Sequence, residues 1–310
     1  MAKILVTENV HEIGPATLRN AGHKVIMADR NMDIVIKEIV DADAILTRIL
    51  ELPASLLENA KNLKHISKHG VGVDNIPLDY CREHGIAVTI APGANSQSVA
   101  EHALSLMLAL AKNLKRVSNA YQKIGFAAKN SDPGMEIDGK TVGVIGCGRI
   151  GSRMARMCVG LGMRVLVYDP YVDQIPPGAE KISRCDELFQ QADVVTLHCL
   201  LSSETQHFVS ARELSLMKPT AILINCARGP VVDEPALIEA LQKGRIAGAG
   251  LDVTAHEPCE ANSPLFQMEN VILTPHYAPT TREASYKVSQ IAAQNILDIL
   301  NGKKPEGLLE

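Results

Sequence analysis

The chain has 310 residues, of which 46% are hydrophobic and 21% are charged, and its formal net charge at pH 7 is -4. This length allows two domains of ordinary size, and the composition is typical of a soluble globular protein. The negative charge and the lack of any basic run argue against nucleic acid as a partner. The longest apolar run, 99–111, is interrupted by Glu101, His102 and Ser105 and is too short to span a bilayer, so we expect no membrane partner.

The seven cysteines are scattered along the chain and form neither a CxxC pair nor a metal-finger spacing. Such a set is typical of a reducing cytoplasm, where thiols serve as small core residues and no metal site is built. The first residues, MAKILVTE, enter a strand-like run at once and leave no room for a signal peptide. We therefore expect a cytoplasmic protein.

The first hundred residues alternate short apolar runs with helical patterns. The helical segments 15–21, 53–60 and 77–84 carry proline near the start and glycine or asparagine near the end, which is typical of helices. This alternation predicts a parallel sheet covered by helices on both faces. The predicted strands are 3–8, 24–28, 44–48, 63–68 and 87–91.

A long helix is predicted at 96–123, because its apolar residues recur at intervals of three and four. A core helix is the simpler interpretation. The apolar surface is broad for a helix that is covered on one side, so a domain-bridging or subunit-contact role stays open.

A second alternation follows and ends in a predicted helix at 281–300. It predicts a second α/β unit. Its predicted strands are 141–145, 164–168, 193–198, 221–225, 246–251 and 271–274.

The stretch "KTVGVIGCGRIGSRMARMCVGLGMRVLVYDP" opens this second half with a GxGxxG motif between a strand and a helix. Gly146 permits a tight turn, Gly148 lets the backbone approach a pyrophosphate, and Gly151 lets helix and strand pack closely. The helix N-terminus offers N–H groups to phosphates. Asp169 ends the next strand and can accept the hydroxyl hydrogens of an adenosine ribose. The pattern predicts a dinucleotide site that prefers NAD over NADP.

Polar residues also follow the later strands, where ligands of such sheets gather: Arg228, then Asp252 and Glu257, then His276. Each residue taken alone is more often structural, but together they supply what hydride transfer to a 2-oxo acid needs. Arg228 offers a bidentate fork to a carboxylate. A protonated His276 can give a proton to the carbonyl oxygen at neutral pH, and a neighbouring carboxylate would hold its ring and favour the charged form.

The motifs GCGRIG with YDP, NCARG, LDVTAHEP and TPH, in this order and spacing, resemble the D-isomer-specific 2-hydroxyacid dehydrogenase family. HGVGVDNIPLD and PGANSQSVAEH are similar to that family's substrate loop and interdomain segment, so the likeness covers essentially the whole chain. It implies an α/β fold in which a Rossmann-type dinucleotide-binding domain, 99–290, is inserted into a flavodoxin-like substrate domain, 1–98 plus 291–310. Both sheets would be parallel and doubly wound.

The resemblance implies that Arg228 binds the substrate carboxylate and that Glu257 pairs with His276, the proton donor in reduction. The backbone N–H groups of Val71 and Gly72 would hold the same carboxylate. The cofactor is implied to be NAD. The residues implied around it are Gly146, Gly148, Arg149, Ile150 and Gly151 at the pyrophosphate, Asp169 at the ribose, Cys199 and Cys226 along the cofactor, and Asp252 at the nicotinamide carboxamide.

Two positions depart from the family pattern: Pro279 stands where glycine is usual, and Leu200 where proline is usual. Neither belongs to the catalytic set, but Pro279 is expected to alter the loop over the nicotinamide and hence substrate choice. His69, inside the substrate loop, is either a specificity group or merely exposed.

The chain looks most like the 3-phosphoglycerate dehydrogenases, with Lys68 standing where those enzymes carry a cation for the phosphate; a solvated lysine is the alternative. The final residues, NGKKPEGLLE, leave no room for the regulatory domain that many of them add, which makes hydroxypyruvate or glyoxylate reduction a close second. A corepressor-like protein that senses NAD(H) is the alternative from another class. We expect a small anionic 2-hydroxy or 2-oxo acid as the substrate and a homodimer through the Rossmann domain.

Overall fold

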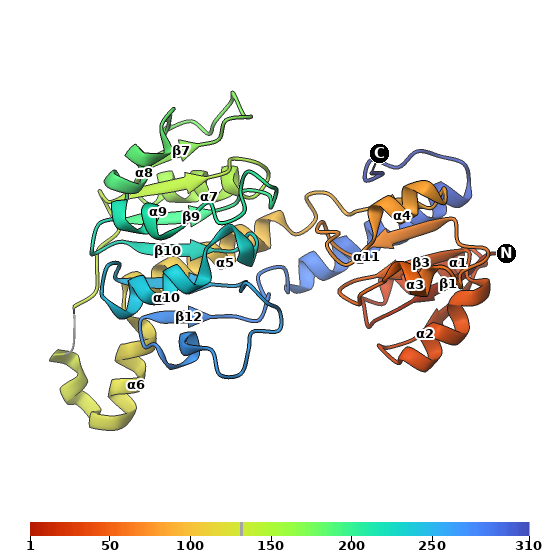
Figure 1. Cartoon of the computed structure of the whole chain (residues 1–310), viewed down its shortest axis with the longest axis horizontal. Helices are drawn as coiled ribbons and strands as arrows, with labels where there is room; N and C mark the ends of the chain where they lie inside the picture. Colours follow the sequence, from red (N-terminus) through yellow and green to blue (C-terminus); the bar gives the residue numbers. More distant parts are fainter. Residues whose placement is uncertain (131–132, 310) are drawn as a thin grey trace. The chain divides into compact units, whose positions relative to one another are not determined.

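The computed structural model describes residues 1–130 and 133–309. The chain forms two compact units: unit 1 comprises Met1–Asn95 and Thr280–Glu310, and unit 2 comprises Ser96–Pro279 (Figure 1). These divisions fall at 95 and 279 rather than at the expected 98 and 290. The second division comes earlier because α11 (Arg282–Leu300) is one continuous helix, and it packs on the sheet of unit 1.

Unit 1 is built on a five-stranded parallel sheet in the order β2-β1-β3-β4-β5. This is the doubly wound order of flavodoxin-like domains, as expected. Every predicted strand of this half is present, with shorter ends. The strands are β1 (Lys3–Val6), β2 (Lys24–Met27), β3 (Ala44–Thr47), β4 (His65–Lys68) and β5 (Ala87–Thr89).

Alternate residues of the unit 1 strands pack on opposite faces of the sheet. Ile4 and Val6 pack with residues of α1 and α11, whereas Leu5 packs with residues of α2, α3 and α4. Helix α2 was not predicted; the side chain of Asn31 caps it by accepting two backbone N–H bonds. Gly14 lets α1 approach α11, since a Cβ there would lie 2.9 Å from the Ser289 carbonyl oxygen. The helices are α1 (Ile13–Asn20), α2 (Met32–Glu38), η1 (Ile39–Asp41), α3 (Ala54–Leu57), α4 (Leu78–Glu83) and α11.

Unit 2 contains a seven-stranded parallel sheet in the order β12-β11-β10-β9-β6-β7-β8. Chain order reverses between β6 and β9, which is the Rossmann arrangement with one further strand at the β12 edge. The six predicted strands are present; β8 was missed because its polar sequence, AEK, carries no apolar alternation. The strands are β6 (Thr141–Ile145), β7 (Arg164–Tyr168), β8 (Ala179–Lys181), β9 (Val194–Leu197), β10 (Ile222–Asn225), β11 (Gly248–Leu251) and β12 (Val271–Leu273).

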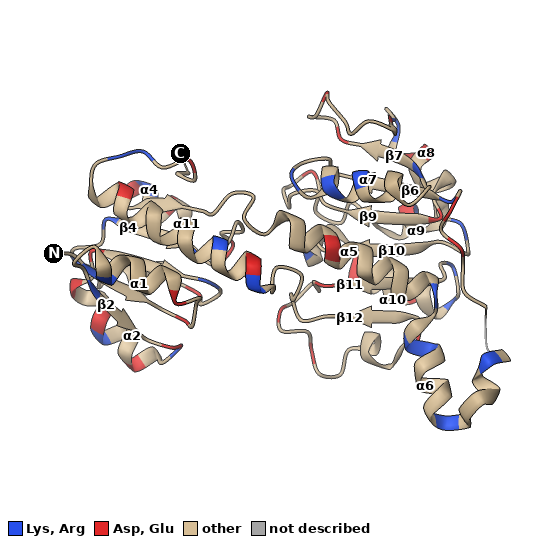
Figure 2. Ribbon diagram, turned by 180° about the vertical axis from the view of Figure 1, so that it is seen from behind, with Lys and Arg blue, Asp and Glu red and all other residues tan. Residues whose placement is uncertain are grey.

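Helices cover both faces of the unit 2 sheet. Helices α5 and α7 pack on one face (Figure 2), and α8, α9 and α10 pack on the other (Figure 1). The single helix predicted at 96–123 is two helices, because Asn113 adopts a left-handed conformation (φ 51°) that ends the first. No helix in 1–130 or 133–309 is long and apolar enough to cross a membrane. The helices are α5 (Ser96–Ala111), α6 (Leu114–Ile124), η2 (Gly125–Asn130), α7 (Gly151–Gly160), α8 (Cys185–Gln191), α9 (Ala211–Leu216), η3 (Gly229–Val231), α10 (Glu234–Gln242) and η4 (Pro264–Gln267).

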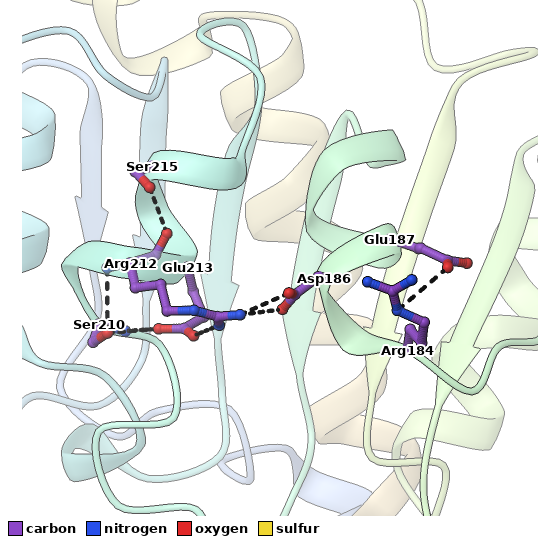
Figure 3. Close-up of polar contacts among 7 residues, drawn as sticks. All are labelled: Arg184, Asp186, Glu187, Ser210, Arg212, Glu213 and Ser215. Carbon is purple, nitrogen blue, oxygen red and sulfur yellow. Dashed lines mark hydrogen bonds and ion pairs between the residues drawn. The ribbon is translucent and has the colours of Figure 1, made fainter.

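An exposed network of charged side chains joins α8 to α9 (Figure 3). The Arg212 guanidinium lies 2.6 and 2.8 Å from the two carboxylate oxygens of Asp186 and also pairs with Glu213. Glu213 closes a capping box with Ser210 at the start of α9. Because these ion pairs are exposed, they orient the two helices more than they stabilise them.

A chain of buried hydrogen bonds ties β4 and β5 to α11. The Ser67 hydroxyl donates to the Ala292 carbonyl oxygen (2.9 Å), and the Thr89 hydroxyl donates to Ser67 (3.3 Å). With the Thr89 hydrogen so used, His65 Nε2 must donate to Thr89 (2.8 Å). Burial lowers the pKa of His65 from 6.5 to about 3.

The depressed pKa of His65 predicts acid sensitivity. The unfolded chain protonates this ring as pH falls below 6.5 while the folded chain does not, so the stability that neutral His65 contributes is complete above pH 6.5 and is lost toward pH 3. His65 is expected to contribute up to ~1.4 kcal/mol per pH unit to the slope of the free energy of unfolding. Urea unfolding from pH 7.5 to 4.5 measures it. His65→Gln should make the curve less steep and exposed His84→Gln should not. Parallel curves for all three proteins would contradict the prediction.

Candidate active site

The glycine-rich loop lies at the point where the strand order of unit 2 reverses, next to the carboxyl end of β9. Gly146 has φ 86°, and a Cβ there would lie 2.6 Å from the backbone nitrogen of Cys199. A Cβ at Gly151 would lie 1.9 Å from the Gly146 carbonyl oxygen. Both positions therefore accept only glycine, since any side chain would push the loop away from β9 or from α7.

Gly148 differs from these two glycines because a Cβ there would meet no protein atom within 4 Å. The backbone of Gly148, Arg149 and Ile150 runs into the first turn of α7, which begins at Gly151. A helix N-terminus with an open approach to its backbone suits a pyrophosphate, which accepts N–H bonds and is favoured by the helix dipole. The residues present thus fit the phosphates of a dinucleotide.

Asp169 directly follows β7 and is bonded to the glycine-rich loop. Its Oδ2 accepts from the Cys147 N–H (2.7 Å) and its Oδ1 from the Tyr171 N–H (2.9 Å). An ionised carboxylate has about four acceptor sites, so two remain for ribose hydroxyls. The structure therefore gives Asp169 a role that the sequence did not suggest, which is to hold the loop in place.

His276 follows β12 in an unusual backbone conformation, with φ 50°. Its Nδ1 lies 2.7 Å from Glu257 Oε2, and both side chains are about two-fifths exposed. A carboxylate only accepts, so Nδ1 carries the hydrogen of this bond. Nε2 takes no part in this contact, so it is the ring nitrogen that can exchange a proton with a ligand.

Asp252 is buried, with 1% exposure, and organises the loop that carries His276. Its carboxylate accepts from the Tyr277 N–H (2.7 Å) and the Ala278 N–H (2.9 Å). Its carbonyl oxygen accepts from the His276 N–H (2.8 Å). The resemblance implies that Asp252 contacts the nicotinamide, and this contact stays a prediction. The structure shows a further role of Asp252, which is to anchor the loop that carries His276.

Arg228 lies in the loop after β10, which pairs with β11, and β11 in turn pairs with β12. The next residue, Gly229, fits tightly: a Cβ there would lie 1.7 Å from the Thr254 carbonyl oxygen in the loop after β11. Asn225 fixes the turn by donating its amide to the Arg228 carbonyl oxygen (3.0 Å). Arg228, Asp252 and His276 therefore share one sheet edge.

The two cysteines expected along the cofactor, Cys199 and Cys226, carry neutral thiols in this fold, and their contact with a cofactor stays a prediction. Cys226 is buried, and Cys199 follows β9 beside the glycine-rich loop. Burial raises the pKa of both thiols, that of Cys199 to about 11. They can contribute apolar surface but are poor nucleophiles at neutral pH. Leu200, the departure next to Cys199, is 82% exposed.

The expected substrate loop lies in unit 1, after β4. Within 1–130 and 133–309, the N–H groups of Val71 and Gly72 donate to no protein acceptor, which leaves them for an anion. Lys68 is 7% exposed, and its Nζ donates to the side chain of Asn75. His69 is not exposed: its Nε2 lies 3.0 Å from Ser289 Oγ, and burial lowers its pKa to about 4.

Known proteins are similar to this chain in sequence and in fold. Residues 104–278 match the model of the D-isomer specific 2-hydroxyacid dehydrogenase, NAD binding domain. The D-3-phosphoglycerate dehydrogenase of Methanocaldococcus jannaschii is 39% identical over 100% of this chain and 59% of its own length. The chain thus spans less than two thirds of this relative. The glyoxylate reductase of Thermofilum pendens is 35% identical over 99% of this chain and 94% of its own length.

Solved structures agree with these sequence matches. The TT0316 protein from Thermus thermophilus superimposes with a TM-score of 0.89 and is 33% identical, covering 99% of this chain and 100% of its own. The D-lactate dehydrogenase with NAD+ from Lactobacillus jensenii has a TM-score of 0.83 and is 29% identical, covering 99% of each chain. The expected fold class is confirmed, and the glycine-rich loop of unit 2 suits the NAD that this family binds. The chain therefore belongs to the D-isomer specific 2-hydroxyacid dehydrogenase family, with unit 2 as its NAD-binding domain.

Proposed function

We propose that the protein is an NAD-dependent oxidoreductase that interconverts a D-2-hydroxy acid and its 2-oxo acid. The observation that carries this proposal is the contact between His276 Nδ1 and Glu257 Oε2 at 2.7 Å, on the sheet edge that also bears Arg228. It supplies an oriented acid, and the glycine-rich loop of the same unit supplies a place for the cofactor.

In the reduction, NADH supplies the hydride that arrives at the carbonyl carbon. Arg228 holds the substrate carboxylate with its planar fork and so orients the carbonyl group. Protonated His276 gives the Nε2 proton to the carbonyl oxygen, and its neutral ring keeps the Nδ1–H bond to Glu257. The oxidation runs in reverse, with His276 Nε2 taking the hydroxyl proton.

For the substrate we propose 3-phosphoglycerate and its 2-oxo acid, with support from the 39% identity to a D-3-phosphoglycerate dehydrogenase. Glyoxylate or hydroxypyruvate reduction is the second candidate. It is favoured by the 94% coverage of a glyoxylate reductase. The Lys68 amine already donates one of its three hydrogens to Asn75. Lys68 as the phosphate anchor therefore stays a prediction.

A panel of 2-oxo acids with NADH, followed at 340 nm, tests the proposed activity. The panel should contain 3-phosphohydroxypyruvate, hydroxypyruvate and glyoxylate, each with the wild-type protein. Turnover of one or more of them is expected. NADH binding with no turnover of any of them would instead favour the alternative of an NAD(H)-sensing, corepressor-like protein.

Arg228→Lys is expected to raise KM for the preferred 2-oxo acid strongly and to leave the Kd of NADH nearly unchanged. Lysine keeps the charge but loses the two parallel N–H bonds to the carboxylate. Steady-state kinetics and NADH fluorescence titration give the two quantities. The matched control is Arg245→Lys, at an exposed arginine of the same unit. Equal weakening of both ligands by Arg228→Lys would identify a structural arginine.

We also propose a homodimer that associates through unit 2. Helix α6 (Figure 1) and η2 support it. Helix α6 contains no buried residue, and Tyr121, Ile124 and Phe126 are between 59% and 77% exposed. A helix of 11 residues is marginal in water unless its apolar face is covered. A second copy of the chain would supply that cover.

Sedimentation velocity should find the wild type as a dimer at micromolar concentration. The double variant Ile124→Glu/Phe126→Glu should sediment as a monomer, because each carboxylate would be buried in the contact. The matched control is Ile36→Glu, which changes an isoleucine of α2 that is 54% exposed, and it should remain dimeric. An α6 variant that stays a dimer would remove α6 from the interface.

A further inference from the structure

We propose that His102, on helix α5, is a positioning residue for the proton donor His276. This inference rests on the proposed dehydrogenase function. The His102 side chain is 18% exposed, and its Nε2 lies 3.0 Å from Thr274 Oγ1 and 3.5 Å from Asp252 Oδ1. From helix α5, His102 therefore contacts Thr274 and Asp252, which belong to or hold the loop that carries His276.

The hydrogen count decides which group donates in this contact. Thr274 Oγ1 lies 2.6 Å from Asp252 Oδ1, and a carboxylate can only accept, so the Thr274 hydroxyl hydrogen points to Asp252. The contact between Thr274 and His102 then needs its hydrogen from the imidazole. His102 thus carries a hydrogen on Nε2 and completes a donor chain that runs from the ring through the hydroxyl to the buried carboxylate.

This chain of hydrogen bonds ends on the carboxylate of Asp252, which holds the loop that carries His276. The Asp252 carboxylate accepts from the N–H groups of Tyr277 and Ala278, and the Asp252 carbonyl oxygen accepts from that of His276. His276 has a φ of 50°, which a residue with a side chain adopts only when its surroundings impose it. A shift of Asp252 would therefore be passed directly to the His276 ring.

The aromatic neighbour of His102 supports the same role. The rings of His102 and Tyr277 lie edge to face, with centroids 6.2 Å apart, so the residue after His276 also contacts His102. His102 consequently touches residues on both sides of the acid in the chain, at Thr274 and Tyr277. Misplacement of a reacting group by about 1 Å can cost ~10²-fold in rate. A positioning residue is therefore expected to affect kcat.

Two substitutions separate the donor from the bulk of the ring. His102→Leu removes the N–H, whereas His102→Gln keeps an N–H donor on a side chain of similar reach. We expect His102→Leu to lower kcat for the preferred 2-oxo acid by ~10-fold or more, with the Kd of NADH unchanged. His102→Gln should bring kcat back to within about threefold of the wild type. Because the His276–Glu257 pair stays intact, the pH profile should keep its shape in both variants.

Amide hydrogen exchange at Tyr277 and Ala278 gives a readout that needs no turnover. His102→Leu should speed exchange at both amides, and His102→Gln should restore their protection. If neither kcat nor exchange changes in His102→Leu, the positioning role is wrong. If both variants lose kcat, NADH binding and thermal stability together, His102 is merely structural. If the wild type turns over no 2-oxo acid, the proposed function is wrong. If exchange is then still faster in His102→Leu and restored in His102→Gln, the hydrogen-bond chain from His102 to Asp252 is nevertheless supported.

Discussion

His276→Ala is expected to slow the reduction of a 2-oxo acid by ~10²–10⁴-fold in kcat, the range typical of a lost general acid. The variant should still fold and bind NADH with an unchanged Kd, because His276 is two-fifths exposed and lies outside the buried core. Alanine removes both the Nε2 proton and the Nδ1 bond to Glu257. Steady-state kcat at saturating substrate and NADH titration by fluorescence measure the two effects.

His207→Ala is the matched control for this substitution. His207 is an exposed histidine of unit 2 whose φ of 52° is close to the 50° of His276, so both variants carry the same backbone conformation. The control should keep kcat within about threefold of the wild type. If the kcat of His276→Ala also stayed within about threefold of the wild type, His276 would not be the acid.

The second large effect concerns the choice of cofactor. We expect NADH to be preferred over NADPH by ~10²-fold or more in kcat/KM, which corresponds to about 2.7 kcal/mol. Asp169 would place a negative charge beside a 2′-phosphate. Glu204 adds a second carboxylate on this side, since its Oε2 accepts from the Tyr171 hydroxyl (2.5 Å). The measurement is kcat/KM for both cofactors with one saturating 2-oxo acid.

The double variant Asp169→Ser/Tyr171→Arg should narrow this ratio by removing one charge and adding a cation. The hydroxyl of the introduced serine would keep an acceptor for the Cys147 N–H, which the Asp169 carboxylate holds at 2.7 Å. The control is Asp173→Ser, which removes a fully exposed carboxylate from the same loop. Comparable values for NADH and NADPH in the wild type would mean that Asp169 does not face the ribose.

The sequence predicted most strands of the molecule well, because their apolar residues form short continuous runs. Both 141–145 and 164–168 were predicted to the residue, because each is a compact apolar run that a turn or a charged residue bounds. Helix α2 was missed because its only clear signal is the cap at Asn31. The break between α5 and α6 was also missed, since an asparagine in the left-handed region is not visible as a pattern of hydrophobic residues.

The same limit applies to the candidate site. The residue types and their order along the chain indicated His276, Glu257 and Arg228, and the structure brings the first two into contact. The hydrogen bond between His102 and Thr274 joins positions 172 residues apart, so no local sequence pattern could predict it. The catalytic roles of these residues stay predictions, whereas the contacts among them are features of the fold.

The return of α11 to unit 1 has a consequence for the order in which the protein folds during synthesis. Unit 2 is continuous in the chain, so it can fold as soon as its last strand has left the ribosome. One face of the unit 1 sheet needs Ala292, Ala293 and Ile296 of α11 to bury Ile4 and Val6. Until α11 emerges, only α1 covers that face, although its strands precede unit 2 in the chain. Unit 1, whose strands are made before unit 2, is therefore completed only after unit 2 has been made.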